Sequence, residues 1–593
     1  MSIPRRALLP ALVFAVAFLT FWPGLSGEFV NWDDDVNFLA NPNFRGLGWS
    51  NLRWMFTTTL MGHWIPLTWL TLGVNYVLGG MAPWGYHLGN LLLHAANAVV
   101  FYAVARRLLA AGTGGERTQG AVAWGAAAAA AVFAVHPLRV ESVAWVTERR
   151  DVLSGLFFLL AVLGYLNAVE RGAGGRLDSR WRAASLGLFA AALLSKASTM
   201  MLPAALLVLD IYPLRRRGVG LAVLLREKIG YFALAGVGAA VALVAVRQGA
   251  TVTGYAAYGL GARAAMTLYS LLFYPWRFLW PVELSPMYEL PARVDPLAWR
   301  FLLPMVAVPA ITAALIVLRR RWPGGLAAWV YSALLVLPVS GAVHAGYQLA
   351  HDRYSYLSGL GFNVLAGGGI AWLLDARARG RVSAMITRSA TAGAAAALLF
   401  LAAASWDQSK VWADSETLWR WAANLDSECA VCWNNLGHAL SGQKRHPEAE
   451  AAYRRVAALR PMTASLANNI AIALAGQRKD ADAEAMLREA LRLDPNLTGA
   501  LLNLGSYEAQ TGRFAEALAH LRKAYALDPR FSGSVKELAQ ALVAAAAAER
   551  KAGRPDQAMA LYQEALTVQP GNAQARDGLE ALSAGRPADG LGR

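Results

Sequence analysis

Long stretches of apolar residues alternate with short polar connections over the first two thirds of the chain. A run of about 20 apolar residues crosses the roughly 30 Å hydrocarbon core of a bilayer as a helix. Eleven apolar stretches, some of them shorter than that, lie at 7–25, 86–105, 121–135, 152–169, 183–195, 198–212, 229–246, 300–318, 324–340, 355–374 and 384–404. The pattern predicts an all-α, polytopic membrane domain over residues 1–405, with about 11 spans.

The connections between these stretches differ in charge. Basic clusters stand at every second connection, at 5–6, 106–107, 171–182, 215–228, 319–321 and 377–381. Because Lys and Arg gather on the cytoplasmic side, the N-terminus is expected in the cytoplasm, as a retained anchor rather than a cleaved signal peptide. Residues after about 405 then lie outside the cytoplasm. For this parity, the proline-containing segment 265–281 must be re-entrant, interfacial or a pair of half-spans.

Beyond residue 405 the residue pattern changes to alternating Ala, Leu, Arg and Glu at helical spacing. Small residues and closing prolines recur there every 34 residues, as in the series Pro461, Pro495 and Pro529. That period predicts about four tetratricopeptide repeats over 434–585, the fourth after a seven-residue expansion around the alanine run at 544–548. The Trp-rich segment 406–433 is expected to connect the repeats to the membrane surface.

The net charge follows the same division. The chain carries 55 Lys+Arg against 39 Asp+Glu, a surplus of 16. Residues 1–405 hold 33 basic and 17 acidic side chains, whereas 406–593 hold 22 of each. The surplus is therefore mostly the set of clusters that orient the spans, and no nucleic-acid partner is expected.

The two cysteines, Cys429 and Cys432, form a C-x-x-C just before the repeats. They are interpreted as two small buried residues, or as a local disulfide if the compartment is oxidising. Neither a second Cys pair nor a neighbouring His cluster supports zinc, and no βαβ pattern supports a redox site.

Three adjacent carboxylates, Asp33, Asp34 and Asp35, follow the first apolar stretch on the predicted external side. Like charges this close raise one another's pKa, which favours one of them as a proton acceptor. A solvated acidic loop without function is the alternative. Three carboxylates alone are weak evidence for a divalent metal, so neither a metal nor another cofactor is expected.

The second external connection, 136–151, is unusually rich in charge for that side of a membrane. Together with Lys196 and the HDRYSY run at 351–356, it supplies several cations that the positive-inside rule disfavours there. Each alone is explained by snorkelling or by a structural ion pair. Cations that converge opposite a carboxylate cluster suit an anionic, lipid-linked phosphate.

The order of these motifs resembles one known family. The motifs are the WDDD loop, PLTWLTLGVNYVLGG, YHLGNLLLHAAN, HPLRVESVAWVTERRDVL, SKAS and HDRYSYLSGLGF, followed by the repeats. This order is similar to that of the transmembrane-and-tetratricopeptide-repeat O-mannosyltransferases, of the C-type (GT-C) glycosyltransferase superfamily. The resemblance implies transfer of a sugar from a polyprenyl-phosphate donor to a protein hydroxyl on the outer face, with inversion. It also implies that the acidic pair Asp33 and Asp34 supplies the catalytic base.

On this reading the donor phosphate is expected at Arg149, Lys196 and Arg353. Further residues expected to line the site are Asp35, His63, His136, Glu141, Arg150, Asp151, His351, Asp352 and Tyr354. The partners are the lipid-linked donor, membrane lipid, and an acceptor protein or peptide that the repeats hold, in the cell (inner) membrane with periplasmic repeats. Two other functions fit the same pattern: a polysaccharide polymerase or ligase that uses lipid-linked glycans, and a non-catalytic scaffold that recruits partners through its repeats.

Overall fold

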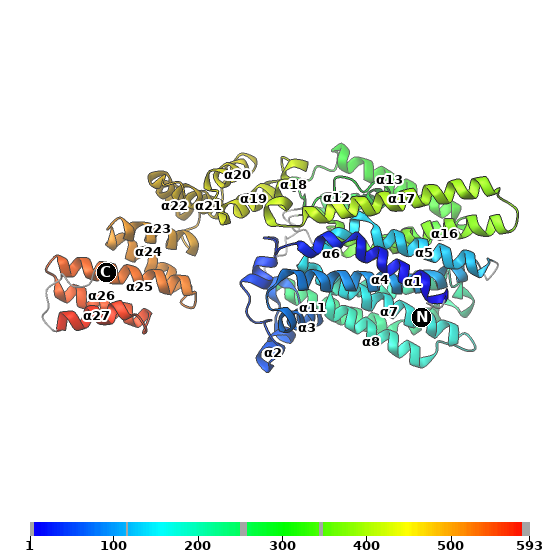
Figure 1. Ribbon diagram of the computed structural model, residues 1–593, viewed down its shortest axis with the longest axis horizontal. Coiled ribbons are helices and arrows are strands. Elements are labelled where there is room, and N and C mark those ends of the chain that lie inside the picture. Colours follow the sequence, from blue (N-terminus) through cyan, green and yellow to red (C-terminus); the bar gives the residue numbers. More distant parts are fainter. Residues whose placement is uncertain (1–4, 114–116, 249–257, 343–347, 584–593) are drawn as a thin grey trace. The chain divides into compact units, whose positions relative to one another are not determined.

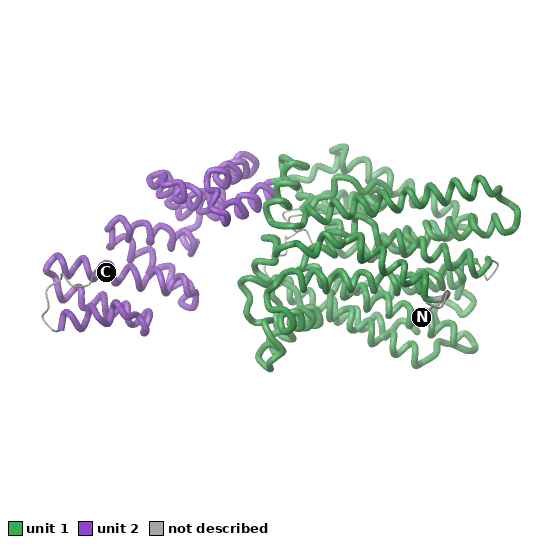
Figure 2. Tube along the Cα trace, in the orientation of Figure 1, with its two compact units in different colours: residues 1–429 green, residues 430–593 purple. Residues whose placement is uncertain are grey.

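The computed structural model describes residues 5–113, 117–248, 258–342 and 348–583. The chain divides into two compact units, residues 1–429 and 430–593 (Figure 2). Within the described residues the only sheet has two antiparallel strands, β1 (Tyr288–Glu289) and β2 (Gln348–Ala350). The rest of the regular structure is helical, and the predicted all-α fold class is confirmed.

Unit 1 is a bundle of long helices that run side by side (Figure 1). Its longer helices are α1 (Arg5–Thr20), α4 (Pro83–Gly112), α5 (Gln119–Val135), α7 (Arg149–Arg171), α8 (Ser179–Ser195), α9 (Leu202–Ile211), α11 (Ile229–Gln248), α12 (Leu260–Leu279), α13 (Trp299–Val317), α14 (Pro323–Val336), α16 (Leu360–Ala378) and α17 (Ala384–Val411). All eleven apolar stretches overlap helices of this set. They pack closely through small residues: a Cβ on Gly125 of α5 would lie 2.6 Å from Ala371 on α16.

Short helices form the connections. The α-helical ones are α2 (Trp49–Thr57), α3 (Pro66–Gly79), α6 (Val140–Ala144), α10 (Leu221–Glu227), α15 (Ser355–Ser358) and α18 (Ser415–Leu425). The remaining turns are η1 (Trp22–Ser26), η2 (Asp35–Leu39), η3 (Leu60–Gly62), η4 (Pro137–Arg139), η5 (Val146–Glu148), η6 (Ala197–Met201), η7 (Arg216–Val219), η8 (Leu318–Arg320), η9 (Leu337–Val339) and η10 (Asp352–Tyr354). The charged motifs of the sequence lie on these short elements and at the helix ends beside them.

Fewer helices than eleven reach membrane-spanning length. In the described residues five helices are long and apolar enough to cross a bilayer, or up to seven if two bent helix pairs each count as one span. Shorter apolar helices include 7–20, 197–211 and 323–339. The segment 265–281 lies mostly on α12, which continues through Pro275 as a single helix rather than as two half-spans.

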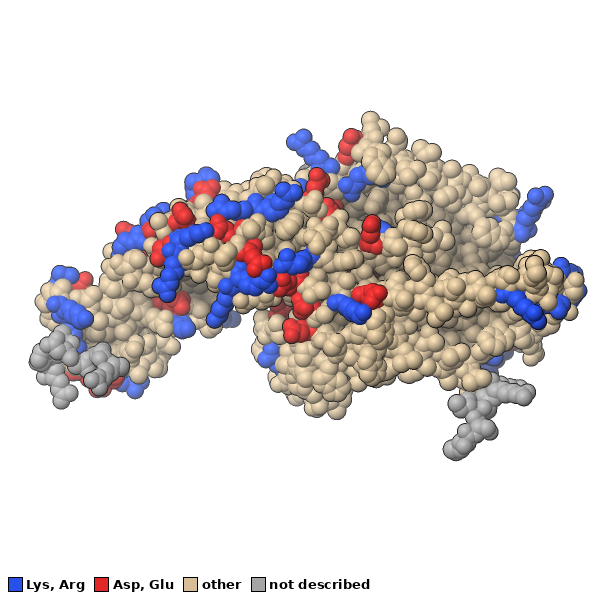
Figure 3. Space-filling model, turned by 45° about the horizontal axis from the view of Figure 1, so that its top comes forward, with Lys and Arg blue, Asp and Glu red and all other residues tan. Residues whose placement is uncertain are grey.

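The outer surface of unit 1 is apolar in the way that a lipid-facing surface is. Leu399 on α17 is 72% exposed and Val317 on α13 is 78% exposed. Figure 3 shows a broad uncharged surface over much of this unit, whereas Lys, Arg, Asp and Glu intermingle over the repeats. Exposed apolar surface of this extent is stable only when something other than water covers it.

Unit 2 is a series of antiparallel helix pairs. The pairs are α19 (Ala430–Gly442) with α20 (His446–Leu459), α21 (Ala464–Ala475) with α22 (Asp480–Leu493), α23 (Thr498–Gln510) with α24 (Phe514–Leu527) and α25 (Ser532–Lys551) with α26 (Pro555–Val568), and α27 (Ala573–Ser583) follows. Helix α25 has 20 residues where α19 and α23 have 13. The seven-residue expansion of the period is thus two additional turns of one helix.

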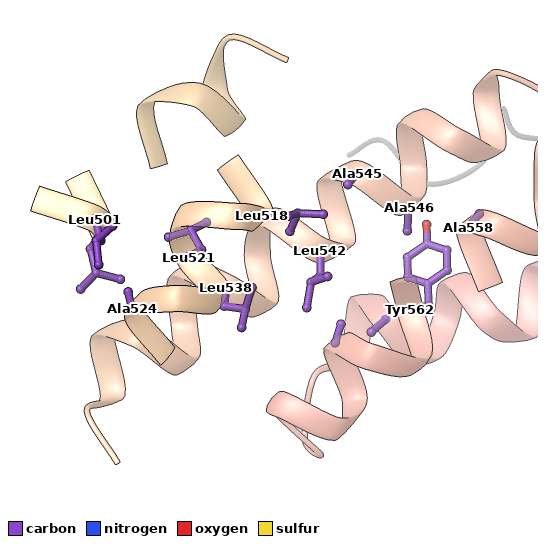
Figure 4. Packing of buried hydrophobic residues seen from close by; sticks show 14 residues of the cluster. Leu501, Leu518, Leu521, Ala524, Leu538, Leu542, Ala545, Ala546, Ala558 and Tyr562 are labelled. Atoms are coloured by element: carbon purple, nitrogen blue, oxygen red, sulfur yellow. The ribbon is translucent and has the colours of Figure 1, made fainter. Parts of the chain in front are cut away.

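Neighbouring repeats share apolar core clusters. Leu521 and Leu542 are completely buried, and Tyr562 packs into the same cluster from the last pair (Figure 4). Gly505 faces Leu521 so closely that an added Cβ would lie 2.6 Å from its Cγ. A repeat of this kind buries its apolar face only against its neighbours, which is why the small positions recur with the period.

The segment between the last long helix of unit 1 and the repeats is not a loose connector. Helix α17 continues to Val411, and α18 packs within unit 1, against the loop that contains Asn31 and the three aspartates. Trp419 is buried there and donates a hydrogen bond from Nε1 to Asn31 Oδ1 at 2.7 Å. Cys429 and Cys432, the only cysteines of the chain, are disulfide-bonded.

Candidate active site

The three aspartates of the first loop take different positions. Asp34 is fully buried, and its Oδ1 accepts hydrogen bonds from Trp145 Nε1 at 3.0 Å, Thr147 N at 3.1 Å and Thr147 Oγ1 at 2.6 Å. Its Oδ2 accepts a further bond from Val30 N at 3.1 Å. Burial raises the pKa of Asp34 to about 7, although these hydrogen bonds act in the opposite direction. Asp34 therefore fastens the first loop to the second.

Asp33 is held in an uncommon backbone conformation beside it. Its φ is +70°, in the left-handed region that few residues other than Gly, Asn and Asp occupy. The side chain is only partly buried, and no hydrogen bond to it is found in the described part of the chain. Burial raises the pKa of Asp33 above its ordinary value, while the charges of Arg150 and Arg353 partly offset that rise. A carboxylate with free oxygens and a raised pKa is suited to accept a proton.

Three cations meet at one carboxylate of the second loop. Glu148 is completely buried. Arg150 Nη2 lies 2.6 Å from its Oε1, Lys196 Nζ lies 2.9 Å from its Oε2, and Arg353 Nε lies 3.2 Å from its Oε1. These cations come from α7, from the turn between α8 and η6, and from η10. Glu148 is thus the point at which three separate parts of unit 1 meet.

Two more carboxylates complete the cluster. Asp151 accepts a bond from Lys196 Nζ at 2.6 Å and another from Ser142 Oγ at 3.2 Å. Glu141 pairs with the guanidinium of Arg353 and accepts the backbone N–H of the same residue at 2.9 Å. Three cations are therefore matched by three carboxylates, and their mutual attraction offsets the desolvation cost of burying these charges.

Each of the three cations keeps donors that the cluster does not use. Arg150 donates to Glu148 through Nε and Nη2. Arg353 pairs with Glu141 through Nη1, and its Nε lies 3.2 Å from Glu148 Oε1 without forming a hydrogen bond. Lys196 uses two of its three N–H groups. Nη1 of Arg150, Nη2 of Arg353 and the third hydrogen of Lys196 have no partner recorded in the described residues. They are the groups with which an anion would bond.

The structure places Arg149 differently from its neighbour Arg150. The Arg149 guanidinium bonds to the side-chain oxygen of Asn90, to Asn75 Oδ1 at 2.8 Å and to the backbone oxygen of Tyr86 at 2.7 Å. These partners belong to α3 and α4. Arg150, which was expected only to line the site, occupies the place beside Lys196 and Arg353.

The predicted histidines divide between the cluster and its surroundings. His351 Nδ1 lies 3.3 Å from Glu141 Oε1, so this ring belongs to the cluster. Desolvation by the surrounding protein, together with the charges of Arg150 and Lys196, lowers the pKa of His63, although its side chain is partly open to solvent. His136 stacks on Phe278 with ring centroids 5.0 Å apart, and both of its ring nitrogens are engaged in backbone hydrogen bonds.

The other predicted lining residues lie at the edge of the cluster. Asp352 accepts a hydrogen bond from Tyr288 Oη at 3.1 Å. The Arg353 guanidinium lies over the ring of Tyr354, 5.1 Å from the ring centroid. Asp35 begins η2 and is partly exposed. Among the described residues no group of three or more His, Cys, Asp or Glu is arranged to hold a metal ion.

Sequence reasoning missed the residue at the centre of the cluster. Glu148 stands in the TERRD run between residues that were chosen, and the excess of cations around it was the available signal. Trp145 and Thr147, the donors to Asp34, were also missed. Their hydrogen bonds join positions 111 and 113 residues apart, which no local pattern reveals.

The apolar helices of unit 1, the charged cluster at their ends and the helix pairs of unit 2 define a class, that of multi-pass membrane proteins with tetratricopeptide repeats. The tetratricopeptide repeat family matches residues 434–498 and 497–570. The crystal structure of YrrB, a TPR protein, is 20% identical, with a TM-score of 0.24 over 28% of this chain and 81% of that one.

Two curated relatives show which known proteins this chain resembles. Protein O-mannosyl-transferase Tmtc2 of Drosophila melanogaster is 36% identical over 214 residues, 34% of this chain and 21% of that protein. Protein O-mannosyl-transferase TMTC4 of Homo sapiens is 34% identical over 198 residues, 31% of this chain and 27% of that protein. The chain spans less than a third of the length of either relative. The resemblance predicted from the motifs is thereby confirmed.

Proposed function

We propose that this chain transfers a mannose-like sugar from a polyprenyl-phosphate donor to a Ser or Thr hydroxyl of an acceptor protein, as a C-type glycosyltransferase. The observation that carries the proposal is the convergence of Arg150, Lys196 and Arg353 on Glu148, within electrostatic reach of Asp33. The names of the relatives support transfer of mannose to protein.

Asp33 is assigned as the base. As the acceptor oxygen forms its bond to the anomeric carbon, the hydroxyl proton passes to a carboxylate oxygen of Asp33. The bond from the anomeric carbon to the donor's phosphate oxygen breaks on the opposite side of the sugar, and its electron pair stays with the phosphate. One carboxylate is therefore enough for an inverting transfer. Asp34 acts as a positioning residue, because its own oxygens are already occupied.

The phosphate is assigned to the unused donors of Arg150, Arg353 and Lys196. Because the cations are already neutralised by carboxylates, the bound phosphate shares them and does not replace Glu148. The negative charge that develops on the leaving phosphate strengthens these contacts in the transition state, which is what accelerates the reaction. Arg149, the third residue of the predicted phosphate set, is assigned to holding α7 against α3 and α4, in agreement with its amide and carbonyl partners.

The site and the repeats are assigned to the extracytoplasmic side of the cell membrane. The alternation of basic connections supports this orientation. The disulfide of Cys429 and Cys432 also favours an oxidising compartment. The repeats are assigned the role of holding the acceptor polypeptide.

The test compares Asp33→Asn with Asp34→Asn in purified full-length protein supplied with a radiolabelled polyprenyl-phosphate sugar and acceptor membranes. Asp33→Asn is expected to lower transfer by about 10²- to 10⁴-fold without changing the thermal midpoint of unfolding. Asp34→Asn is expected to lower the midpoint as well, since one of its buried donors loses an acceptor.

Asp407→Asn is the matched control, because the ion pair found for Asp407 in the described residues is with Lys410, on an exposed face of α17. Transfer at the wild-type rate in Asp33→Asn, Asp34→Asn and the double variant would show that the base is assigned wrongly.

Glycan analysis of a deletion strain separates the rival functions. Loss of protein-linked sugar supports the proposal, altered surface polysaccharide points to a polymerase or ligase, and no change in either points to a scaffold.

A further inference from the structure

Unit 1 contains a second candidate site, in the other half of the bundle. A cavity of about 710 Å³ lies between α4, α7, α9, α14 and α16. Its walls are mostly aliphatic and aromatic, and include Phe101, Leu108, Phe158 and Leu365. Pockets of about 300–1,000 Å³ hold compact organic ligands. None of the carboxylates and cations joined through Glu148 lines the described walls of this cavity.

One end of the cavity is polar and basic. Arg117, Tyr212, Arg321 and Trp322 line it there, at or beside the ends of α5, α9, η8 and α14. Arg321 is exposed. Arg117 donates one N–H to the backbone oxygen of Gly368 at 3.3 Å, and no other hydrogen bond of its guanidinium is found within the described residues. Trp and Tyr side chains at such a position are typical of the level of lipid headgroups.

The depth of the cavity matches one leaflet of a bilayer. Along α16 the lining residues extend from Leu360 to Trp372. At about 1.5 Å per residue this is about 18 Å, close to half of a hydrocarbon core that is roughly 30 Å thick. An apolar slot of that depth with cations at its mouth has the proportions of a leaflet phospholipid.

We infer that this cavity binds an acyl chain of an anionic glycerophospholipid, whose phosphate contacts Arg117 and Arg321. Basic mouths between membrane helices recognise anionic headgroups in this way. The direction of the cavity argues against the sugar donor as its occupant. Helix α4 has Asn90, the partner of Arg149, near its first residues, and the basic mouth at its last residues, beside Gly112. A donor whose phosphate lies at Lys196 would have its phosphate at the end of the helices opposite to Arg117 and Arg321. These two cations would then have no phosphate to bind.

The experiment measures lipid binding to delipidated full-length protein in non-ionic detergent by native mass spectrometry. Phosphatidylglycerol and phosphatidylcholine with the same chains are titrated in parallel. Phosphatidylglycerol is expected to bind about 10- to 30-fold more tightly, the effect of two cations near a headgroup. The double variant Arg117→Gln with Arg321→Gln is expected to lower it to the affinity of phosphatidylcholine.

A second variant tests the apolar part. Gly369→Leu places a side chain in the cavity, because a Cβ at Gly369 meets no atom within 4 Å, and it is expected to weaken both lipids. Gly393→Leu is the matched control on α17: its Cβ is equally unobstructed, but the residue does not line the cavity, so no change is expected.

Equal affinity for the two lipids, or unchanged binding in Gly369→Leu, would overturn the inference. So would binding of polyprenyl phosphate that displaces phosphatidylglycerol and is lost in Gly369→Leu, since the cavity would then hold the donor's tail. The measurement involves no sugar transfer. Its failure is therefore distinguishable from failure of the proposed function.

Discussion

Replacement of Lys196 by Met tests whether the buried charge cluster is held together as described. Lys196 Nζ lies 2.6 Å from Asp151 Oδ1 and 2.9 Å from Glu148 Oε2. Without the ammonium group, Glu148 keeps Arg150 and Arg353, whereas Asp151 keeps only the neutral Ser142 hydroxyl. The substitution therefore removes the direct ion pair of one buried carboxylate.

The magnitude follows from the geometry. At an effective dielectric constant of about 20, two unit charges separated by the 2.6 Å of the Asp151 pair attract by about 6 kcal/mol. Breaking a buried ion pair from one side costs about 3–5 kcal/mol in measured cases. Lys196→Met is thus expected to lower the free energy of unfolding by about 3–5 kcal/mol.

A double-mutant cycle separates this explanation from general loss of packing. Asp151→Asn removes the carboxylate that Lys196→Met leaves unpaired, so the double variant is expected to unfold at a temperature no lower than that of Lys196→Met. Tryptophan fluorescence of the full-length protein in one detergent gives the four midpoints. If Asp151→Asn lowers the midpoint of Lys196→Met by as much as it lowers that of wild type, the reasoning is refuted. Lys410→Met is the control, because its pair with Asp407, 2.8 Å apart, is exposed and is expected to contribute about 0–1 kcal/mol.

Three further predictions concern other parts of the chain. Transfer should fall as the pH drops through the pKa of Asp33, which burial raises above 3.8, because only the ionised carboxylate accepts a proton. His63→Gln should leave that profile unchanged, since the pKa of His63 is lowered and the ring is not assigned a role in proton transfer. Gly505→Val should lower the stability of the repeats by about 1–3 kcal/mol through its clash with Leu521, measured by thermal unfolding against the unobstructed Gly442→Ala. A thiol-reactive maleimide should label the unfolded protein only after reduction; labelling before reduction would contradict the disulfide.

The periodic features of the chain were readable from the sequence. Each apolar stretch is mainly helical, and the 34-residue period of the prolines gives the repeats, because both depend on spacing along the chain. Span lengths were less readable. Pro275 was expected to interrupt its segment, yet α12 continues through it, since tertiary packing compensates for the lost backbone hydrogen bond.

The motifs of the site were readable, but not the direction of each side chain. Arg149 and Arg150 are neighbours at the start of α7, about 100° apart around the helix axis, so they face different elements. Choosing between them requires the first residue of the helix to be known, and sequence places helix ends only to within a few residues. Asp33 and Asp34 differ for another reason. The environment of Asp34 is set by Trp145 and Thr147, which lie more than 100 positions away.

The packing of α18 decides where the protein can be divided in the laboratory. A truncation after residue 405, where the apolar composition ends, would cut through α17, which ends at Val411, and would remove α18. The loop that contains the three adjacent aspartates would then lose the backbone hydrogen bond from Glu28 N to Ala413 O. It would also lose the hydrogen bonds that Asn31 makes with Ser415 and Trp419. Loss of activity in such a fragment would be misread as a requirement for the repeats. Any exchange of repeats between relatives should therefore retain the chain through Leu425, so that only the repeats change.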